Sequence, residues 1–531
     1  ACMHFRSLPA WLPVLLLAPA VESQAQVAST GSPYSAFGLG DLLNTGNTPS
    51  AIMGGTGIAY SEPYSLRPVN PASYSAARYY DGEGLKRPVF DAGVRALFVR
   101  QESGGHSTRR TDAQFTGLSV GVPFGKGRWG LGLGITPFSD VGYSLVARSR
   151  VDGHEVAYEY KGSGGLNRVF AGVGHVLWQA ERDSSGHLGG RLAIGANFDF
   201  IFGSIEQTRN AVYPRELAYT NTRAFSSLVL RAPSGSFGLH YSAAVTSRTR
   251  EVRTRQQRAA RAREHMDKWY LTHVDTLRLV PADLVEWRMA RTDSARLDLL
   301  RRLSFKVAYT DSASMPRRKD IEEVFPWRFT IGLIASLPIG FNAMNDQLVT
   351  SFWRGSTGIE QVIDTLPSSG SSTGSVTVPP SFGAGISLYN ARWFATAEAT
   401  RRDWSAMRVD LPGYSAPEQL RASMTYGFGV RFTPDDEGSA LKRTTYRIGL
   451  RYTEDYIVVK GSPLNTMAIS GGVSIPLNAV QTNSYFHIGV EYGQRSGRDA
   501  SLLSERFTHI LAGISITPWA RERWFQRSRI Q

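Results

Sequence analysis

The sequence has very little cysteine and lacks long hydrophobic runs. Its one cysteine among 531 residues is Cys2, so the rest of the chain can form neither a disulfide nor a thiolate metal site. No run of 18 apolar residues follows residue 25, which excludes a membrane protein built from helices. The ten histidines show no His-Glu-x-x-His spacing, so no metal site is expected.

The first 25 residues have the organisation of a secretory signal peptide. His4 and Arg6 precede an apolar run from Leu8 to Ala20, and Ser23-Gln24-Ala25 follows. A basic start, a short apolar stretch and a small residue at the end are typical of a signal that is removed after export. We therefore expect residues 1–25 to be cleaved after Ala25. The exported chain then contains no cysteine, so something other than disulfides must close its fold.

Short segments near the C-terminus alternate between apolar and polar or glycine residues. In Tyr446–Tyr452 the intervening residues are Arg, Gly and Arg, and in Phe486–Tyr492 they are His, Gly and Glu. Such alternation is typical of strands with one face toward lipid and the other toward a wet lumen. The 53 glycines, 11% aromatic residues and only 42% hydrophobic residues agree with this interpretation. The sequence thus predicts a barrel in the outer membrane of a Gram-negative bacterium.

Fourteen strands can be counted, which predicts an all-β fold, a 14-stranded antiparallel transmembrane β-barrel. The strands are expected at 89–101, 114–123, 129–150, 156–178, 191–208, 224–245, 327–353, 381–389, 393–409, 420–433, 446–458, 465–476, 485–495 and 507–517. The expected segments are a hatch at 26–88, strands 1–6 within 89–246, an insertion at 247–326, strands 7–14 within 327–517 and a basic tail at 518–531.

An even strand count places both ends of the barrel on the periplasmic side. The tight connections 124–128 and 390–392 then also face the periplasm. The polar stretches 355–378 and 410–419 are expected to be outer loops.

The predicted periplasmic insertion is basic and helical in composition. Helices are expected over Arg253–Tyr270 and Pro281–Leu303, which are rich in Arg, Ala, Glu and Leu. Seven arginines cluster at its start: Arg248, Arg250, Arg253, Arg255, Arg258, Arg261 and Arg263. The insertion is either a solvated helical pair under the barrel or a docking element for an acidic protein or anionic headgroups. The formal net charge of +14 favours anionic neighbours in general.

The region before the first strand is glycine-rich and does not alternate, so short helices or loops are expected there. It contains Met53-Gly54-Gly55-Thr56-Gly57-Ile58-Ala59 and then Asn70-Pro71-Ala72. Further short motifs occur at 162–167, 402–405, 471–477 and 524–525. With these motifs the chain resembles the FadL-type outer-membrane transporter superfamily, which includes the PorV-like branch.

The resemblance implies fourteen strands, a hatch and two sets of moving parts. The implied gating residues in the hatch are Gly54, Gly55, Asn70 and Pro71. The implied positions beside a lateral gap in the wall are Pro137, Gly162, Gly164 and Gly165, because proline and glycine weaken strand pairing. The competing interpretation is that these wall residues only bend a closed barrel.

The strand phases also predict which charged side chains face the lumen. These are Glu398, Arg431, Arg447, Arg451, His487 and Glu491. They are expected either to form ion pairs that brace the hatch or to bind the carboxylate of a ligand.

Two functions therefore remain open after the sequence has been read. The first is passive uptake of small hydrophobic molecules, such as long-chain fatty acids or hydrocarbons, by hatch rearrangement and lateral exit. The second is a non-transporting binding or assembly partner in the outer membrane, such as a PorV-like secretion component. The expected neighbours are outer-membrane lipids, a hydrophobic small molecule and a protein docked at the insertion. No enzymatic activity, cofactor or nucleic-acid partner is expected.

Overall fold

The structure is a computed structural model of the chain. It describes residues 31–43, 46–60, 62, 65–78, 88–125, 128–151, 154–180, 190–214, 219–245, 281–290, 292–296, 299, 327–355, 359–366, 370–390, 392–412, 419–434, 439–477, 484–499 and 501–517. Within these ranges no helix is long and apolar enough to cross a membrane.

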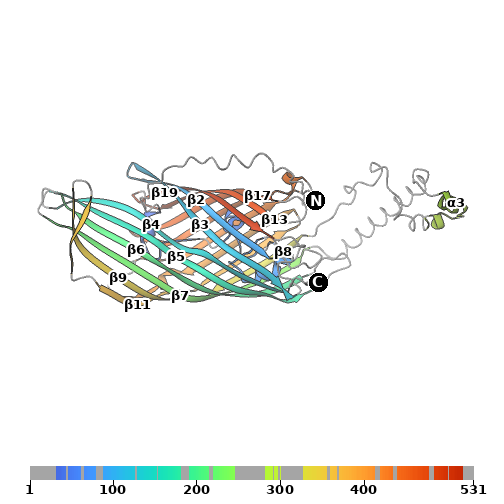
Figure 1. Cartoon of the computed structure of the whole chain (residues 1–531), viewed down its shortest axis with the longest axis horizontal. Helices are drawn as coiled ribbons and strands as arrows, with labels where there is room; N and C mark the ends of the chain where they lie inside the picture. The colour runs from blue at the N-terminus through green and yellow to red at the C-terminus, as the bar shows by residue number, and fades with distance from the viewer. Residues whose placement is uncertain are drawn as a thin grey trace, which may run out of the picture.

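The wall is one antiparallel sheet that closes on itself (Figure 1). Its strands are β2 (Val89–Ser103), β3 (His106–Phe124), β4 (Trp129–Val151), β5 (His154–Gln179), β6 (Gly190–Val212), β7 (Asn221–Ala244), β8 (Arg328–Ser336), β9 (Ile339–Arg354), β10 (Glu360–Thr365), β11 (Gly370–Val378), β12 (Ser381–Tyr389), β13 (Trp393–Asp403), β14 (Arg408–Asp410), β15 (Ala422–Phe432), β16 (Thr445–Val459), β17 (Ser462–Pro476), β18 (Tyr485–Gly497) and β19 (Ser504–Ile516). β8 and β9 form one wall strand, β10 to β12 form the next, and β19 pairs with β2. The predicted fourteen-stranded all-β barrel is confirmed.

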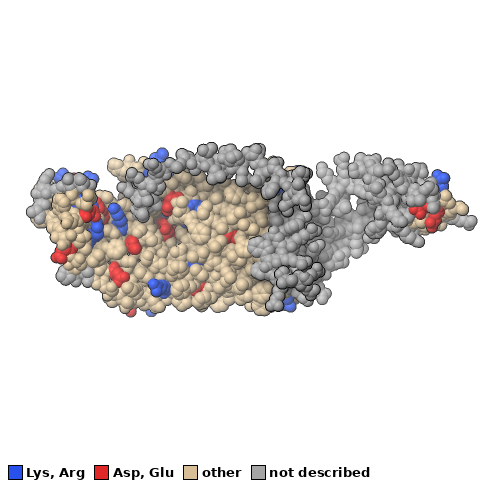
Figure 2. All heavy atoms as spheres, in the orientation of Figure 1, with Lys and Arg blue, Asp and Glu red and all other residues tan. Residues whose placement is uncertain are grey.

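Alternation of side chains gives the wall its two faces. Along β18, His487 and Glu491 point into the lumen and are buried, whereas Ile488, Val490 and Tyr492 are exposed on the outside. The outer face in Figure 2 is largely free of charge, and charged side chains gather toward the end where β4 to β7 and β9 extend furthest. A closed barrel with an apolar outside and a polar lumen is the architecture of outer-membrane proteins. The predicted location in a Gram-negative outer membrane is therefore confirmed.

The wall is much taller on one side than on the other. β4 to β7 are 23 to 26 residues long, whereas β13 and β15 have 11 residues each. About ten tilted residues suffice to cross a membrane, so the longer strands rise beyond it. The expectation of an outer loop at 355–378 is wrong, because β10 and β11 continue the wall along β9. Above the membrane both faces of the sheet are wet, so this serine-rich stretch carries no apolar alternation.

The described residues of 31–78 lie inside the barrel, and we call them the plug. They form η2 (Pro33–Ala36), β1 (Asp41–Leu42), α1 (Thr48–Ile52) and η3 (Pro71–Arg78) rather than long strands, as the sequence predicted. The side chain of Asn47 caps α1 by accepting from the Ser50 backbone N–H at 3.2 Å. η3 packs against β4 to β7. A Cβ at wall residues Gly174, Gly195 or Gly238 would collide with Pro71 or Asn70, so the plug sits directly on a glycine track.

The predicted insertion is only partly described. Its described helix is α3 (Pro281–Met289), which lies beyond the end of the barrel in Figure 1. The helix expected over 281–303 is interrupted, because the chain leaves the helix at Ala290 and a separate helical turn covers 293–296. The helix expected over 253–270, all seven clustered arginines, the signal peptide and the C-terminal tail lie outside the described residues.

Candidate functional site

Glu62 is the centre of the plug's attachment to the wall. Its carboxylate pairs with Arg447 at 2.8 Å, with Arg67 of the plug at 3.0 Å and with Arg431 at 3.3 Å. The hydroxyl of Tyr60 donates to it at 2.7 Å. Burial raises the pKa of Glu62, but the three guanidinium groups outweigh that effect and hold its pKa well below the usual range. Glu62 is therefore ionised and fully paired.

A second carboxylate, Glu398 on β13, holds the glycine-rich motif. The backbone N–H groups of Gly57, Ile58 and Ala59 donate to its two oxygens at distances between 2.7 and 2.9 Å. Consecutive N–H groups that converge on one carboxylate form an anion nest, here with the anion supplied by the wall. The motif at 53–59 thus wraps a wall side chain.

The predicted gating residues are firmly bound in the lumen. Asn70 donates to the carbonyl oxygens of Ile58 at 2.8 Å and Leu239 of the wall at 3.3 Å, and Pro71 begins η3. Gly54 and Gly55 adopt positive φ angles of 68° and 77°, where a Cβ would be strained. The N–H of Gly54 donates to the hydroxyl of Ser470 on β17 at 3.2 Å.

The remaining residues predicted to face the lumen also lie there and form polar networks. Arg451 pairs with Glu491, which also contacts His509 at 2.9 Å. His487 contacts the hydroxyls of Ser474 at 2.6 Å and Ser515 at 2.8 Å. These contacts join wall strands to one another, from β16 to β19.

Sequence reasoning missed other members of these networks. Arg495 pairs with Asp41 of the plug at 2.7 Å and with Asp455 at 2.8 Å. It shares the strand phase of His487 and Glu491, which could have revealed it. Asp91 accepts from the N–H of Leu66 at 2.6 Å. It also occupies a lumen-facing position in the alternating pattern of β2, which could have revealed it.

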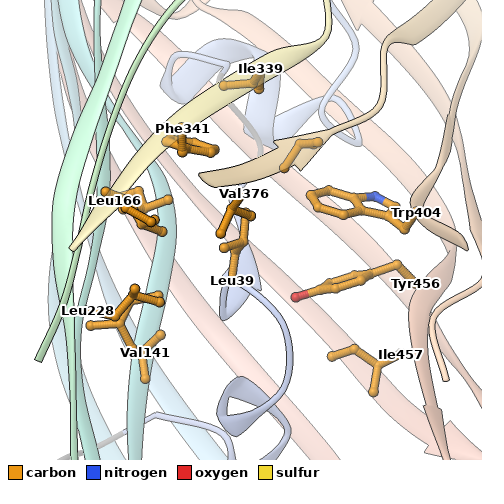
Figure 3. Packing of buried hydrophobic residues seen from close by; sticks show 14 of the residues in the cluster. Leu39, Val141, Leu166, Leu228, Ile339, Phe341, Val376, Trp404, Tyr456 and Ile457 are labelled. Atoms are coloured by element: carbon orange, nitrogen blue, oxygen red, sulfur yellow. The ribbon is translucent and has the colours of Figure 1, made fainter. Parts of the chain in front are cut away.

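An apolar layer crosses the lumen beside the plug (Figure 3). Leu39 of the plug lies between Leu166 and Leu228 on one wall and Trp404 and Tyr456 on the other. The rings of Trp404 and Tyr456 lie 4.7 Å apart, and the Tyr456 hydroxyl donates to the carbonyl oxygen of Gly40 at 2.6 Å. These side chains are almost completely buried, so the layer is a packed core that holds the start of the plug.

A cavity of about 480 Å³ remains between the plug and the wall. Apolar residues such as Ile201 and Phe507 line part of it. Charged residues from around the barrel also line it: Asp41, Arg95, Arg168, Asp199, Glu398, Arg402, Arg451, Asp455, Glu491, Arg495 and Glu505. The lining thus combines apolar surface with more charged groups than a pocket for a hydrophobic ligand usually carries.

The wall pairing is interrupted between β3 and β4. These strands pair only from Phe124 and Trp129 to Leu118 and Ile135. Beyond that point residues 106–117 of β3 pair with β2 alone among wall strands, and residues 136–151 of β4 pair with β5. We call this stretch the open seam. The cavity extends to it, because residues of both strands, including Phe115 and Pro137, line the cavity.

The plug lies across the inner side of the open seam. β1 pairs with β4 through Asp41 and Asp140 and through Leu42 and Ser139. The side chain of Gln114 on β3 donates to Asp140 on β4 at 2.7 Å, so side chains bridge the seam where the backbone does not.

Of the four predicted lateral-gap positions, only Pro137 borders the open seam. It lies beside a register shift in β4, as expected where a ladder donor is missing. Gly162, Gly164 and Gly165 lie in β5, which stays paired with both β4 and β6 at these positions. The expectation that these glycines mark a gap is therefore not supported by the register.

Two Gly-x-Ser-x-Gly sequences occur, at 117–121 and 370–374. Their serines, Ser119 and Ser372, lie within β3 and β11. A hydrolase nucleophile of this motif needs a sharp turn from strand to helix. Neither sequence is placed for that chemistry.

Comparison with solved structures finds toluene transporters among similar folds. The Ralstonia pickettii toluene transporter TbuX is 12% identical, with 88% of this chain and 97% of that chain covered and a TM-score of 0.45. The P. putida toluene transporter TodX is 12% identical, with 90% and 99% covered and a TM-score of 0.47. A Pseudomonas aeruginosa FadL homologue is 11% identical, with 90% and 99% covered and a TM-score of 0.45. Proteins of the FadL type, to which the sequence motifs pointed, are thus among the solved structures that this chain resembles.

A comparison with curated proteins finds no match. The family model BamG matches residues 10–279 and 320–531. Both matched ranges include the plug or wall strands, and together they cover more than half of the sequence. This chain therefore belongs to the BamG family.

Proposed function

We propose that this chain is a plugged, non-transporting barrel that acts as a partner in outer-membrane protein assembly. The observation that carries the proposal is the attachment of the plug through Glu62, whose carboxylate is shared by three arginines. Separating a buried carboxylate from its partners costs about 3–5 kcal/mol. Glu398 and Asn70 add further bonds between the plug and the wall. Opening the hatch would have to break these contacts together.

Two further observations support a partner role. The cavity is lined by many charged side chains from around the barrel, more than binding a hydrophobic cargo requires. Membership of the BamG family also supports a Bam-related role. The basic insertion, with Arg248 to Arg263, is the proposed docking element for a protein partner, and outer-membrane lipids surround the apolar wall.

The proposal is tested by depletion and by purification of the full-length tagged chain from its own outer membrane. Depletion should lower the amounts of several unrelated outer-membrane barrels, and the purified chain should bring an assembly factor with it. A matched variant in which the seven arginines of 248–263 are changed to glutamine should still form the barrel but lose the partner. A chain that purifies alone, and whose depletion leaves other barrels unchanged, would contradict the proposal.

A lateral-exit conduit is the second candidate, because the cavity reaches the open seam. Leu42 and Ser139 are register partners on β1 and β4, so a Leu42→Cys/Ser139→Cys disulfide would fasten the plug across the seam. The wall pair Thr453→Cys/Thr466→Cys, from register partners on β16 and β17, is the control. Uptake of toluene or laurate that stops only with the first disulfide and returns with reductant would favour the conduit. Unchanged barrel assembly and unchanged uptake would favour the partner role.

A further inference from the structure

Among the described residues, two lumen arginines make weaker contacts with carboxylates than the arginines of the other networks do. Arg168 lies on β5 and Arg402 on β13, and both line the cavity. Arg168 forms a long ion pair with Asp199, whose Oδ1 atom lies 3.9 Å from Arg168 Nε, too far for a hydrogen bond. Among the described residues, Arg168 Nε and Nη2 and Arg402 Nε are buried without hydrogen-bond partners. The two guanidinium groups therefore have more N–H donors than the surrounding described residues have acceptors for them.

This situation contrasts with Arg447, whose guanidinium pairs with Glu62. Within the described part of the chain, Arg402 Nη2 donates to the neutral hydroxyls of Ser381 at 3.1 Å and Ser336 at 3.2 Å. Burying a guanidinium group without an anionic partner is costly. Arg168 and Arg402 line the same cavity, where their like charges repel. One anion placed between them would offset both costs.

The groups around the two arginines define what kind of anion fits. Ser234, Ser236, Ser336 and Ser381 line the same cavity, and Asp199 adds one negative charge whose Oδ1 has no hydrogen-bond partner. Arg402 lies over the ring of Trp404, 5.4 Å from its centroid, which fixes the guanidinium from the apolar side. Hydroxyls and guanidinium groups together favour a small hydrophilic oxyanion over a group that carries an alkyl chain.

We propose that the lumen binds a small oxyanion of the carboxylate or phosphate class between Arg168 and Arg402. The guanidinium groups provide charge-assisted hydrogen bonds from β5 and β13, and the hydroxyls of Ser336 and Ser381 lie beside them. The anion would join β5 to β13 within the cavity between the plug and the wall. This inference does not rest on the assembly role and holds for a conduit as well.

The test measures the thermal unfolding midpoint of the full-length barrel in detergent at matched ionic strength. Sodium phosphate and sodium acetate are compared with sodium chloride, and laurate below its micellar concentration is a third probe. Phosphate or acetate at saturation should raise the midpoint by about 3 °C. The more effective of the two identifies the anion class. A rise with laurate alone would overturn the proposal of a hydrophilic anion.

Arg168→Met and Arg402→Met should each abolish the rise, whereas Arg402→Lys should keep part of it. Arg95→Met is the matched control, because Arg95 lines the same cavity but already bonds to Gln114 at 2.9 Å. It should respond to the anions like the wild type. Equal anion responses in the wild type and in Arg168→Met, or no response in the wild type, would overturn the proposal. In crystals soaked with selenate, an oxyanion that scatters anomalously, a peak should appear between the two arginines only in the wild type and in Arg95→Met.

Discussion

The barrel has two seams that differ in strand pairing: one is continuously paired and the other is interrupted. At the closed seam β19 pairs with β2 without a shift from Ser504 and Glu102 to Ile516 and Phe90. At the open seam β3 and β4, which are neighbours in sequence, part after Leu118 and Ile135. The junction between the chain's distant ends is therefore continuous, while the junction inside a hairpin is broken. Local residues such as Gly117, with a φ of 148°, and Pro137 decide where pairing stops.

The plug also makes different contacts with the wall near the two seams. On the side of the closed seam Asp91 of β2 and the arginines of β15 and β16 hold its central part through buried bonds. At the open seam β1 contributes a two-residue pairing to β4. The comparison predicts that the plug is released first from the open seam and last from the other side. The following changes test that order.

The largest effect is expected from Glu62→Gln. The change leaves the buried guanidinium groups of Arg67 and Arg447 without a counterion, so the barrel should lose about 3–5 kcal/mol of stability. Thermal unfolding and protease cleavage within 31–78 measure this. Glu155→Gln is the control, since its pair with Arg148 is exposed and should be worth less than about 1 kcal/mol. Equal effects would refute a central role for Glu62.

Acid should release the central part of the plug through the same carboxylate. The folded-state pKa of Glu62 is lowered from its ordinary value of 4.5, so its stabilisation is complete above that value and declines as the pH falls through the lowered folded-state pKa. Protease sensitivity of the plug should stay constant from about pH 8 to pH 5 and rise below about pH 4. In Glu62→Gln, the rise in protease sensitivity below about pH 4 should be smaller than in the wild type. A transition near neutral pH would point to a different group.

An intermediate effect is expected at the closed seam from Gly513→Ala. A Cβ there would meet Thr48 of α1 and lie 3.1 Å from the carbonyl oxygen of Ala92, so the stability should fall by about 1–3 kcal/mol. Gly340→Ala is matched in type, but a Cβ at Gly340 has no atom within 4 Å. A midpoint of Gly513→Ala equal to that of Gly340→Ala would show that α1 is not seated against this seam.

Cross-linking should change stability least and map the seam most directly. Val120 and Leu133 are register partners in the paired part of β3 and β4, so cysteines there should form a disulfide on mild oxidation. Cysteines at Gln114 and Asp140 lie across the open seam, where only long side chains meet, and should need a longer bifunctional reagent. Non-reducing gels after a single protease cut between the strands distinguish the two. If both cysteine pairs oxidised equally well, the strands would be paired at Gln114 and Asp140 too, and the open seam would be refuted.

The wall was predictable because two solvents impose a period of two on every strand that crosses the membrane. The same reasoning explains its failures. β10 and β11 form wall above the membrane, where no apolar face is required. Glu62 lies outside the regular strands, so no strand phase could reveal that it faces Arg447. The open seam depends on which register two strands keep, and only Pro137 gave a local sign of it.

The closed seam also sets an order of events in folding. β2 and β19 are the first and last strands of the wall, so the ring cannot close before the end of the chain has been added to the sheet. The plug is attached directly to β2 and sits on the glycine track of β5 to β7. A curved sheet can gather around that segment while it is still open, and the last hydrogen bonds to form then trap it inside. The plug would therefore act as a template on which the wall strands assemble.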